Sequence, residues 1–438
     1  MTTATVSLST EDAESRTGRY TSPIAHAGFS GQDLIAAARR LSPLLGAGAS
    51  ARDQARTLPH AELDWVRQAG ITAARVPKAF GGPDLPFSSI ARAMIWLAKG
   101  DPSVAQVLIP HFTSVERIRL TGSSAQRERY FAGLLQGDLI SGATGELGGQ
   151  FATDMTTRLQ ATPDGLRLNG RKFYSTGGLM ADRLRVTAKD DSGDTVSVMV
   201  PRTRAGIVQH NDWDGMGQRL TASGTTDFEN VRVREDEVMF YSSAERKKRN
   251  YQPAATQMLH STIEVGIALA VLDDAIDWAH RGARPRPDSG VQRSVDDPYV
   301  QHIIGNIIAH AHAAEAVLLR AAASVDEAVA AWHDGTSGEA LEQALVDASI
   351  ATAEAKIVCN GAALRAGELI FDVGGSSATL GQHNFDRHWR NARTHTTHDP
   401  INHRYRVVGT YYLNQVPPPI TMYDLSLIHI SEPTRLRR

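Results

Sequence analysis

The stretch with the highest density of chemically active side chains is "HTTHD", near the C-terminal end of a chain of 438 residues. His395 and His398 would share one face of a helix, with Asp399 beside them and His403 about one turn further along. Such a set can bind a metal ion, transfer protons or lie on an ordinary helix surface. Pro400 disfavours helical geometry in Asp399, which predicts a helix end there, where the dipole stabilises a positive imidazole. The residues alone leave all three interpretations open.

The elements that must position this stretch belong to segments that differ in their pattern of apolar and polar residues. Residues 1–32 are predicted to form a disordered leader, and residues 33–137 show the apolar periodicity of helices. Residues 138–241 change to alternating apolar and polar runs, separated by turn signals such as "PDG" and "DDSGD". This pattern predicts a small antiparallel β domain.

Residues 250–424 return to helical periodicity in long, alanine-rich segments. Asp297 is a predicted N-cap with Pro298 in the first helical position, and Gly374 and Gly375 end a second long helix. Helices of this kind usually pack against one another as a bundle. The predicted fold class is therefore α+β, with an N-terminal helical domain, a middle antiparallel β domain and a C-terminal helix bundle.

The composition narrows the classes of function. A formal net charge of −2 gives no reason to expect a nucleic acid or an anionic membrane as partner. The chain has one cysteine, Cys359, which excludes an internal disulfide framework and fits a reducing compartment. The N-terminus is polar, and we find no apolar run of about 20 residues. We therefore expect a cytoplasmic protein.

The last residues differ from the rest of the chain. The segment "LSLIHISEPTR" follows a proline-rich ending and continues none of its patterns. It resembles the translation of a transposase-adapter sequence, so we interpret residues 425–438 as an artefactual tail.

Several common cofactor motifs are absent from the sequence. There is no P-loop, no G-x-G-x-x-G after a strand, no H-E-x-x-H and no paired C-x-x-C. The glycine-rich run "GATGELGGQ" has no βαβ context and is by itself a weak signal.

The order of helices, β domain and helix bundle resembles the acyl-CoA dehydrogenase superfamily. Four stretches carry the resemblance, namely "RVPKAFGGPDLPF", "NDWDGMGQRLTASGTTDFENVRV", "FDRHWRNARTHTTHDP" and "VGTYYLN". They are most similar to a flavin-dependent monooxygenase branch, which includes enzymes that act on dibenzothiophene and enzymes linked to the use of dimethyl sulfone. The resemblance covers the chain from about residue 35 to residue 422.

This resemblance implies a homotetramer that holds reduced FMN, or less commonly FAD, between the β domain and the bundle. The reduced flavin would come from a separate flavin reductase, with O2 and a small molecule as the other substrates. Six residues match positions that contact the flavin or the neighbouring subunit in the family: Thr144, Thr176, Trp213, Arg284, Gly374 and Gly375.

The resemblance also changes the interpretation of "HTTHD". Asp399 falls on the glutamate that removes a substrate proton in acyl-CoA dehydrogenases, but its side chain is one methylene shorter. Oxygen transfer needs instead a group of near-neutral pKa and a dry pocket. We therefore expect His395 and His398, with Asp399, to manage protons rather than bind metal, and we expect His111 to converge with them.

The function that follows is a two-component flavin monooxygenase acting on a small organosulfur compound such as a sulfone or thioether. Two alternatives are an acyl-CoA dehydrogenase or oxidase with FAD, and an N-hydroxylase of an amine or amino sugar. A non-catalytic flavin-binding protein is a third, since fold does not fix function.

Overall fold

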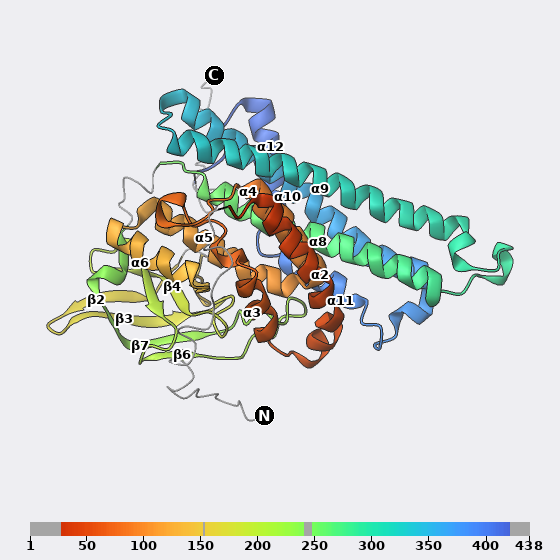
Figure 1. Cartoon of the computed structure of the whole chain (residues 1–438), viewed down its shortest axis with the longest axis horizontal. Coiled ribbons are helices and arrows are strands. Elements are labelled where there is room, and N and C mark those ends of the chain that lie inside the picture. The colour runs from red at the N-terminus through yellow and green to blue at the C-terminus, as the bar shows by residue number, and fades with distance from the viewer. Residues whose placement is uncertain (1–27, 152–153, 241–247, 421–438) are drawn as a thin grey trace, which may run out of the picture.

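The computed structural model describes residues 28–151, 154–240 and 248–420 (Figure 1). Helices of the N-terminal region lead into a β domain, and long helices follow as a C-terminal bundle, which confirms the predicted order. Most of the predicted leader, residues 1–32, and all of the predicted artefactual tail, residues 425–438, lie outside the described residues.

The N-terminal helices begin at side-chain caps where the sequence provides them. Ser30 and Asp33 form a capping box at the first helix, and the carboxylate of Asp101 accepts from the main-chain N–H groups of Ser103 and Val104. The α-helices of this region are α2 (Gly31–Ala55), α3 (His60–Gln68), α4 (Phe87–Gly100), α5 (Pro102–Thr121) and α6 (Ser124–Leu135), with 3-10 turns η2 (Ile71–Ala73) and η3 (Lys78–Phe80).

The β domain is a single sheet in the order β6-β7-β3-β2-β4-β5-β8, with β1 paired to β4. Both predicted turns form hairpins, because β2 pairs antiparallel with β3 across "PDG", and β4 pairs with β5 across "DDSGD". The predicted antiparallel pairing covers most of the sheet, but the sheet is mixed, since β1 runs parallel to β4 over its whole length and β2 pairs parallel with β4 at one position. In the chain, β1 follows helix α6 and not another strand, so no tight turn sets its direction. The strands are β1 (Ile140–Ala143), β2 (Arg158–Thr162), β3 (Gly165–Lys172), β4 (Arg183–Lys189), β5 (Thr195–Pro201), β6 (Ile207–Gln209), β7 (Thr226–Val233) and β8 (Val238–Phe240), with η4 (Glu235–Glu237) before β8.

The C-terminal bundle contains the longest helices. Asp297 caps α9 as predicted, because its carboxylate accepts from the main-chain N–H of Tyr299, and α10 ends at Gly374. The helices are α8 (Gln252–Arg281), α9 (Pro298–His333), α10 (Gly338–Gly374), α11 (Asp386–Thr396) and α12 (Ile401–Asn414), with short turns η5 (Pro287–Ser289), η6 (Ser294–Asp296) and η7 (Gly375–Thr379).

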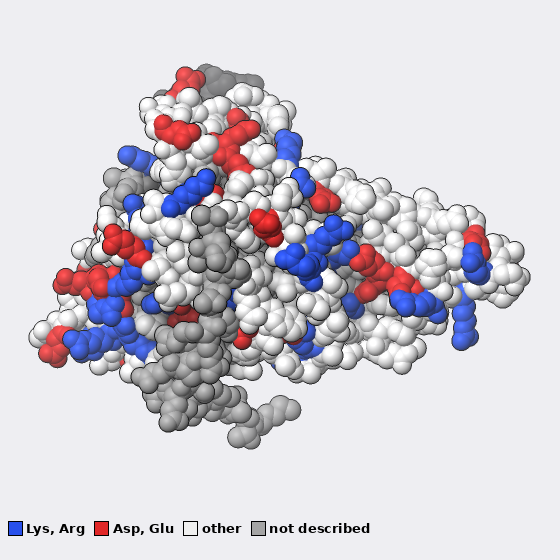
Figure 2. Space-filling view, in the orientation of Figure 1, with Lys and Arg blue, Asp and Glu red and all other residues white. Residues whose placement is uncertain are grey.

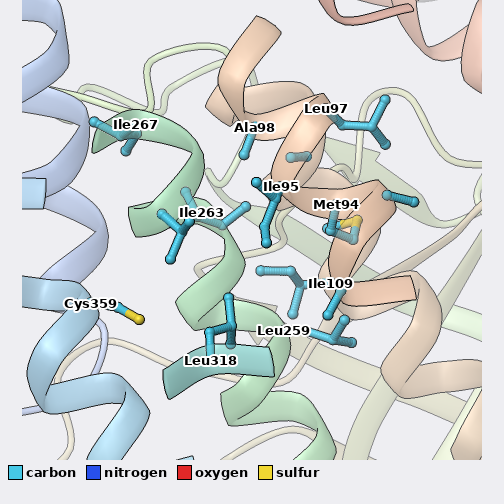
Figure 3. Packing of buried hydrophobic residues seen from close by; sticks show 14 of the residues in the cluster. Met94, Ile95, Leu97, Ala98, Ile109, Leu259, Ile263, Ile267, Leu318 and Cys359 are labelled. Carbon is cyan, nitrogen blue, oxygen red and sulfur yellow. The ribbon is translucent and has the colours of Figure 1, made fainter. Parts of the chain in front are cut away.

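Helix α8 is the central element of the main hydrophobic core. Its side chains Leu259, Ile263 and Ile267 pack between α4 on one side and the bundle helices on the other (Figure 3). A Cβ atom at Gly266 would lie 2.4 Å from the Cβ of Ala98, so glycine there allows α4 and α8 to cross closely. Each buried leucine or isoleucine stabilises this arrangement by roughly 1.5–3 kcal/mol. Chemical groups on α8 are therefore held rigidly.

Two described helices are long and apolar enough to cross a membrane by length and composition alone, namely α8 and α9. In α8 the apolar window is 83% buried, as expected for a core helix, whereas in α9 it is 22% buried. Charged side chains gather over the β domain, and the long end of the bundle shows fewer of them on the face in Figure 2. Between residues 298 and 314, α9 has no lysine, arginine, aspartate or glutamate.

Candidate active site

Two of the hydroxyl groups predicted to contact flavin lie at one edge of the β domain. Thr144 directly follows β1, and its carbonyl accepts a hydrogen bond from Lys172 Nζ at 3.1 Å. The hydroxyl of Thr176 lies 2.8 Å from that of Ser223, and the Thr176 carbonyl accepts from Ser141 Oγ at 2.6 Å. These bonds fix the end of β1 and the loop around Thr176 relative to each other.

Trp213, the third predicted contact, belongs to an aromatic cluster beside this edge. Its ring centroid lies 6.2 Å from that of Phe173 and 6.1 Å from that of Tyr174. Tyr174 is 52% exposed and has a positive φ of 62°, a backbone conformation that is costly for a bulky residue. Leu147, three residues after Thr144, and Met216, three residues after Trp213, are also exposed. The edge therefore combines hydroxyl groups with an accessible aromatic surface.

A short series of hydrogen bonds connects Trp213 to α11. Trp213 Nε1 donates to the carbonyl of Gln218 at 2.9 Å, and the main-chain N–H of Gln218 donates to Asn391 Oδ1 at 2.7 Å. A Cβ atom at Gly217 would lie 2.0 Å from the carbonyl oxygen of Arg390, so only glycine permits this approach. The loop that carries Trp213 is thus fixed against the helix that carries His395.

His395 occupies the last turn of α11 and is the centre of a buried hydrogen-bonded chain. Its Nδ1 lies 2.8 Å from Glu264 Oε1, and its Nε2 lies 3.0 Å from His260 Nδ1. The ring of His260 also contacts His398, with 4.2 Å between ring centroids and an interplanar angle of 31°. Three imidazoles and one carboxylate therefore form a continuous cluster.

Helix α10 adds two polar residues to this cluster. The side chain of Lys356 is fully buried, and its Nζ has no hydrogen-bond partner among the described residues. Asn360, with its amide nitrogen turned towards Glu264, donates to Glu264 Oε1 at 3.1 Å. The carboxylate of Glu264 is thus surrounded by groups that favour its negative charge.

The pKa shifts follow from this burial and charge. Burial lowers the pKa of His260 well below its ordinary value, and the charges of His398 and His395 act in the same direction. Burial raises the pKa of Glu264, but the charges of His395 and Lys356 lower it by more, so the carboxylate stays ionised.

His398 lies in the turn between α11 and α12, where the predicted helix break is confirmed. Burial by surrounding atoms, with the charges of Lys356 and His395, lowers its pKa to about 4. In the single chain, however, the His398 side chain is exposed, and water favours its charged form. The charges of Lys356 and His395 therefore account for the lowered pKa more than burial does. They outweigh the helix dipole that the sequence predicts to favour a positive ring.

Asp399 does not take part in the imidazole cluster. Its carboxylate accepts from both Nε and a terminal nitrogen of Arg404, and both side chains are 13% exposed. The group that aligns with the family's base is therefore held in an ion pair.

Among the described residues, His111 shares no hydrogen bond or ring contact with His395 or His398, which corrects the expectation that it joins them in one cluster. Its Nε2 donates to the carbonyl of Thr72 at 2.7 Å, and its Nδ1 accepts from the main-chain N–H of Ile140 at 3.2 Å. Burial lowers the pKa of His111 to about 4. Both ring nitrogens are occupied by main-chain groups, so His111 ties α5 to η2 and β1. The third imidazole of the cluster is His260 instead.

Comparison with known proteins shows which family the chain belongs to. The chain is 30% identical over 400 residues to dibenzothiophene monooxygenase of Rhodococcus erythropolis, covering 88% of this chain and 95% of that protein. The chain belongs to the acyl-CoA dehydrogenase family, in its monooxygenase branch. The family models match in two parts, the acyl-CoA dehydrogenase N-terminal domain at residues 37–138 and the C-terminal domain at residues 258–403.

Two further relatives extend the comparison. The probable FMNH2-dependent monooxygenase SfnC of Pseudomonas putida is 29% identical, covering 89% of this chain and 97% of that protein. The crystal structure of FMN-bound TdsC from Paenibacillus sp. A11-2 superposes with a TM-score of 0.83 at 28% identity, covering 89% of this chain and 99% of that one.

The remaining residues predicted from the family resemblance lie at the far end of the bundle. Arg284 is exposed in the loop after α8. A Cβ atom at Gly374 would lie 2.2 Å from Trp278 Nε1, so packing requires glycine there, and Gly375 has a positive φ of 58°. In the single chain, packing at Gly374 and the backbone conformation at Gly375 explain why both positions are glycine. Of these three residues, Arg284 alone has no structural role within the described part of the single chain.

Sequence reasoning missed His260, Glu264, Lys356 and Asn360. A signal was present, because His260 and Glu264, and likewise Lys356 and Asn360, are spaced four residues apart and so share one face of a long helix. Charged side chains in a core helix are rarely buried unless they are paired. Their partners, however, come from three different helices, and only the fold brings these together.

The described residues contain no group of three or more histidine, cysteine or acidic side chains placed to hold a metal ion. One cavity of about 410 Å³ lies between α2, the start of α5, α8 and α11, and Asn391 and His388 line it. It borders α11 one turn before His395, and neither His395 nor His398 is among its lining residues.

Proposed function

We propose that this protein is a reduced-FMN-dependent monooxygenase that acts on a small organosulfur compound. One atom of O2 enters the substrate and the other leaves as water, with two electrons and two protons supplied by the reduced flavin. The observation that carries the proposal is the turn after α11. There the aligned carboxylate, Asp399, is bound to Arg404, while His398 contacts a cluster of imidazoles.

The residues at the edge of the β domain fit a flavin. The isoalloxazine is flat and has polar atoms along one side, so it suits a wall with an aromatic face and hydroxyl donors. Trp213 and Tyr174 supply the aromatic surface, and Thr144 and Thr176 supply hydroxyl groups. The buried hydroxyl of Ser175 has no hydrogen-bond partner among the described residues and adds a donor beside them.

Bound reduced flavin supplies the electrons that activate O2, and the side chains control the protons and the access of water. His398 is the residue of the cluster that is exposed to exchange protons with a bound reactant, since His395 and His260 are buried. Its lowered pKa, below the near-neutral value expected from the sequence, keeps it neutral near pH 7, where one ring nitrogen donates a hydrogen bond and the other accepts one. Arg404 holds the Asp399 carboxylate away from the role of a strong base.

We propose that the working form is a cytoplasmic homotetramer supplied by a separate flavin reductase. The exposed apolar surface of α9 supports association, because its uncharged segment, residues 298–314, favours a partner subunit over water if it is largely uncovered in one chain, as the apolar window of this helix is. Arg284 lies in the loop that precedes α9, so it would reach the flavin of a neighbouring subunit. Oligomeric state and a Kd for FMNH2 can be measured together by analytical ultracentrifugation with anaerobic titration.

The experiment that tests the function supplies FMNH2 from a reductase, O2 and a panel of sulfones, sulfinates and thioethers. We expect one oxygen atom from ¹⁸O2 in the product of at least one organosulfur compound. Incorporation into amines alone would replace this proposal with N-hydroxylation.

A further inference from the structure

A buried chain of three groups lies behind His398, in the order Glu264, His395, His260. An ionised carboxylate only accepts hydrogen bonds, so His395 must donate its Nδ1 proton to Glu264 Oε1, across 2.8 Å. The contact of 3.0 Å between His395 Nε2 and His260 Nδ1 then contains one proton, which belongs to either ring. The geometry therefore defines two states of the same chain.

The two states differ by one proton at the outer end. When His395 is neutral, His260 carries its proton on Nδ1 and donates it to His395 Nε2. When His395 is an imidazolium, its Nε2 donates to His260 Nδ1, and His260 carries its proton on Nε2. Passing between them breaks one N–H bond on His260 Nδ1 and forms one on His395 Nε2, while a proton is bound at His260 Nε2.

The charges on every helix around the chain limit it to one added proton. Lys356 on α10 and Glu264 on α8 balance each other, and Arg404 and Asp399 at α12 are paired. An added proton is best placed on His395, which touches Glu264 directly. A second proton on His260 would put two positive rings in contact, with centroids 5.1 Å apart, and a second proton on His398 is disfavoured by the charges of Lys356 and His395.

We propose that Glu264, His395 and His260 form a proton relay that serves His398 during turnover, with Glu264 and His260 as positioning residues. The role of the relay in turnover rests on the proposed monooxygenase function. The relay stores one proton behind the site and releases it from His260, whose ring contacts that of His398. The fully buried carboxylate stabilises the stored charge, which water cannot do at that depth.

The first test uses the parent protein without flavin. The nitrogen shifts of ¹⁵N-labelled histidine report which ring nitrogen of each imidazole carries a proton. We expect the ring of His260 to exchange its proton from Nδ1 to Nε2 when the hydrogen-bonded chain takes up one proton. A single tautomer of His260 across the pH range in which the protein is folded would overturn the relay.

The second test uses variants with a matched control on the same helices. His388 lies two turns before His395 on α11, is also buried, and is hydrogen-bonded to Asp274 on α8 at 2.7 Å. Among the described residues it makes no hydrogen bond to another histidine. We expect His260→Gln to lower the product formed per O2 at least tenfold. We expect Glu264→Gln to make the product formed per O2 fall more steeply as the pH rises than it does in the parent. His388→Gln should leave coupling within twofold.

The outcomes separate the two proposals. If the tautomer exchange occurs and no substrate is oxygenated by the parent, the relay stands and the proposed function fails. If the parent oxygenates substrate and His260→Gln is equally well coupled, the relay is overturned. The parent spectrum needs no substitution, so the proposal stays testable even where a variant fails to fold.

Discussion

Glu264 Oε1 and His395 Nδ1 lie 2.8 Å apart, and neither side chain is exposed to solvent. α8 provides one and the last turn of α11 provides the other, so the pair fixes the end of α11 against the core helix. Removing one partner leaves a buried polar group without its hydrogen bond, which typically costs about 1–3 kcal/mol, and more for a charged group. The same contact thus fixes the histidine turn and sets its charge.

The buried histidines predict how stability depends on pH. Burial lowers the pKa of His111 to about 4 and that of His260 well below 6.5. Between pH 6.5 and the folded pKa, the unfolded chain binds protons that the folded chain does not, so stability falls as pH falls. We expect a slope of up to about 1.4 kcal/mol per pH unit for each of the two rings. Urea denaturation at pH 7, 6 and 5 measures it, and a flat profile would contradict the burial of these neutral rings.

Replacing His111 tests whether it is structural. His111→Phe leaves the carbonyl of Thr72 and the N–H of Ile140 without a partner, which should cost roughly 2–6 kcal/mol for two buried groups. Product formed per O2 by the folded fraction should change by less than about threefold, well below the usual worth of acid–base assistance. Unchanged stability combined with lost coupling would restore the catalytic role expected from the sequence.

The sequence predicted the fold well because most of its signals are local. The "PDG" hairpin, the Asp297 cap and the break at Pro400 each depend on a few neighbouring residues, and all three are confirmed. The direction of β1 was missed, since it depends on the chain path from α6 rather than on a turn.

The site was only partly predictable for the same reason. His395 and His398 are close in sequence and stay close in space, whereas His111 was expected to join them and is bound by main-chain groups instead. His260 and Glu264 come from α8, and nothing local to "HTTHD" indicates them. Partners drawn from separate helices become visible only when the helices are packed.

Arg284 should contribute to flavin binding without contributing to stability. It is exposed, so Arg284→Ala should change the free energy of unfolding by less than about 0.5 kcal/mol. Loss of a charge-assisted hydrogen bond to an FMN phosphate, worth about 1.5–3 kcal/mol, should raise the Kd for FMN tenfold or more. Arg286→Ala is the control, because Arg286 is already paired with Asp288 at 2.9 Å. Equal effects of the two substitutions would contradict the assignment of Arg284.

Acyl-CoA dehydrogenation should be absent. The aligned base, Asp399, is one methylene shorter than glutamate and is held by Arg404, so we expect it to be displaced from the position that proton removal requires. The test is anaerobic mixing of FAD-loaded protein with acyl-CoA esters of different chain length, followed by flavin absorbance. Rapid bleaching by any of them would favour the dehydrogenase alternative.

The central claim is that His398 manages protons in oxygen transfer, and coupling measures it most directly. His398→Phe removes proton transfer but keeps an aromatic ring against His260, and His403→Phe is the control, because His403 is exposed in α12. The measurement is product formed and hydrogen peroxide released per O2 consumed, for parent and both variants, with and without a chelator. We predict that His398→Phe lowers oxygen transfer by roughly 10²–10⁴, that O2 is still consumed and appears as hydrogen peroxide, and that His403→Phe and the chelator have little effect. Unchanged coupling in His398→Phe, or loss of parent activity with the chelator, would contradict the account.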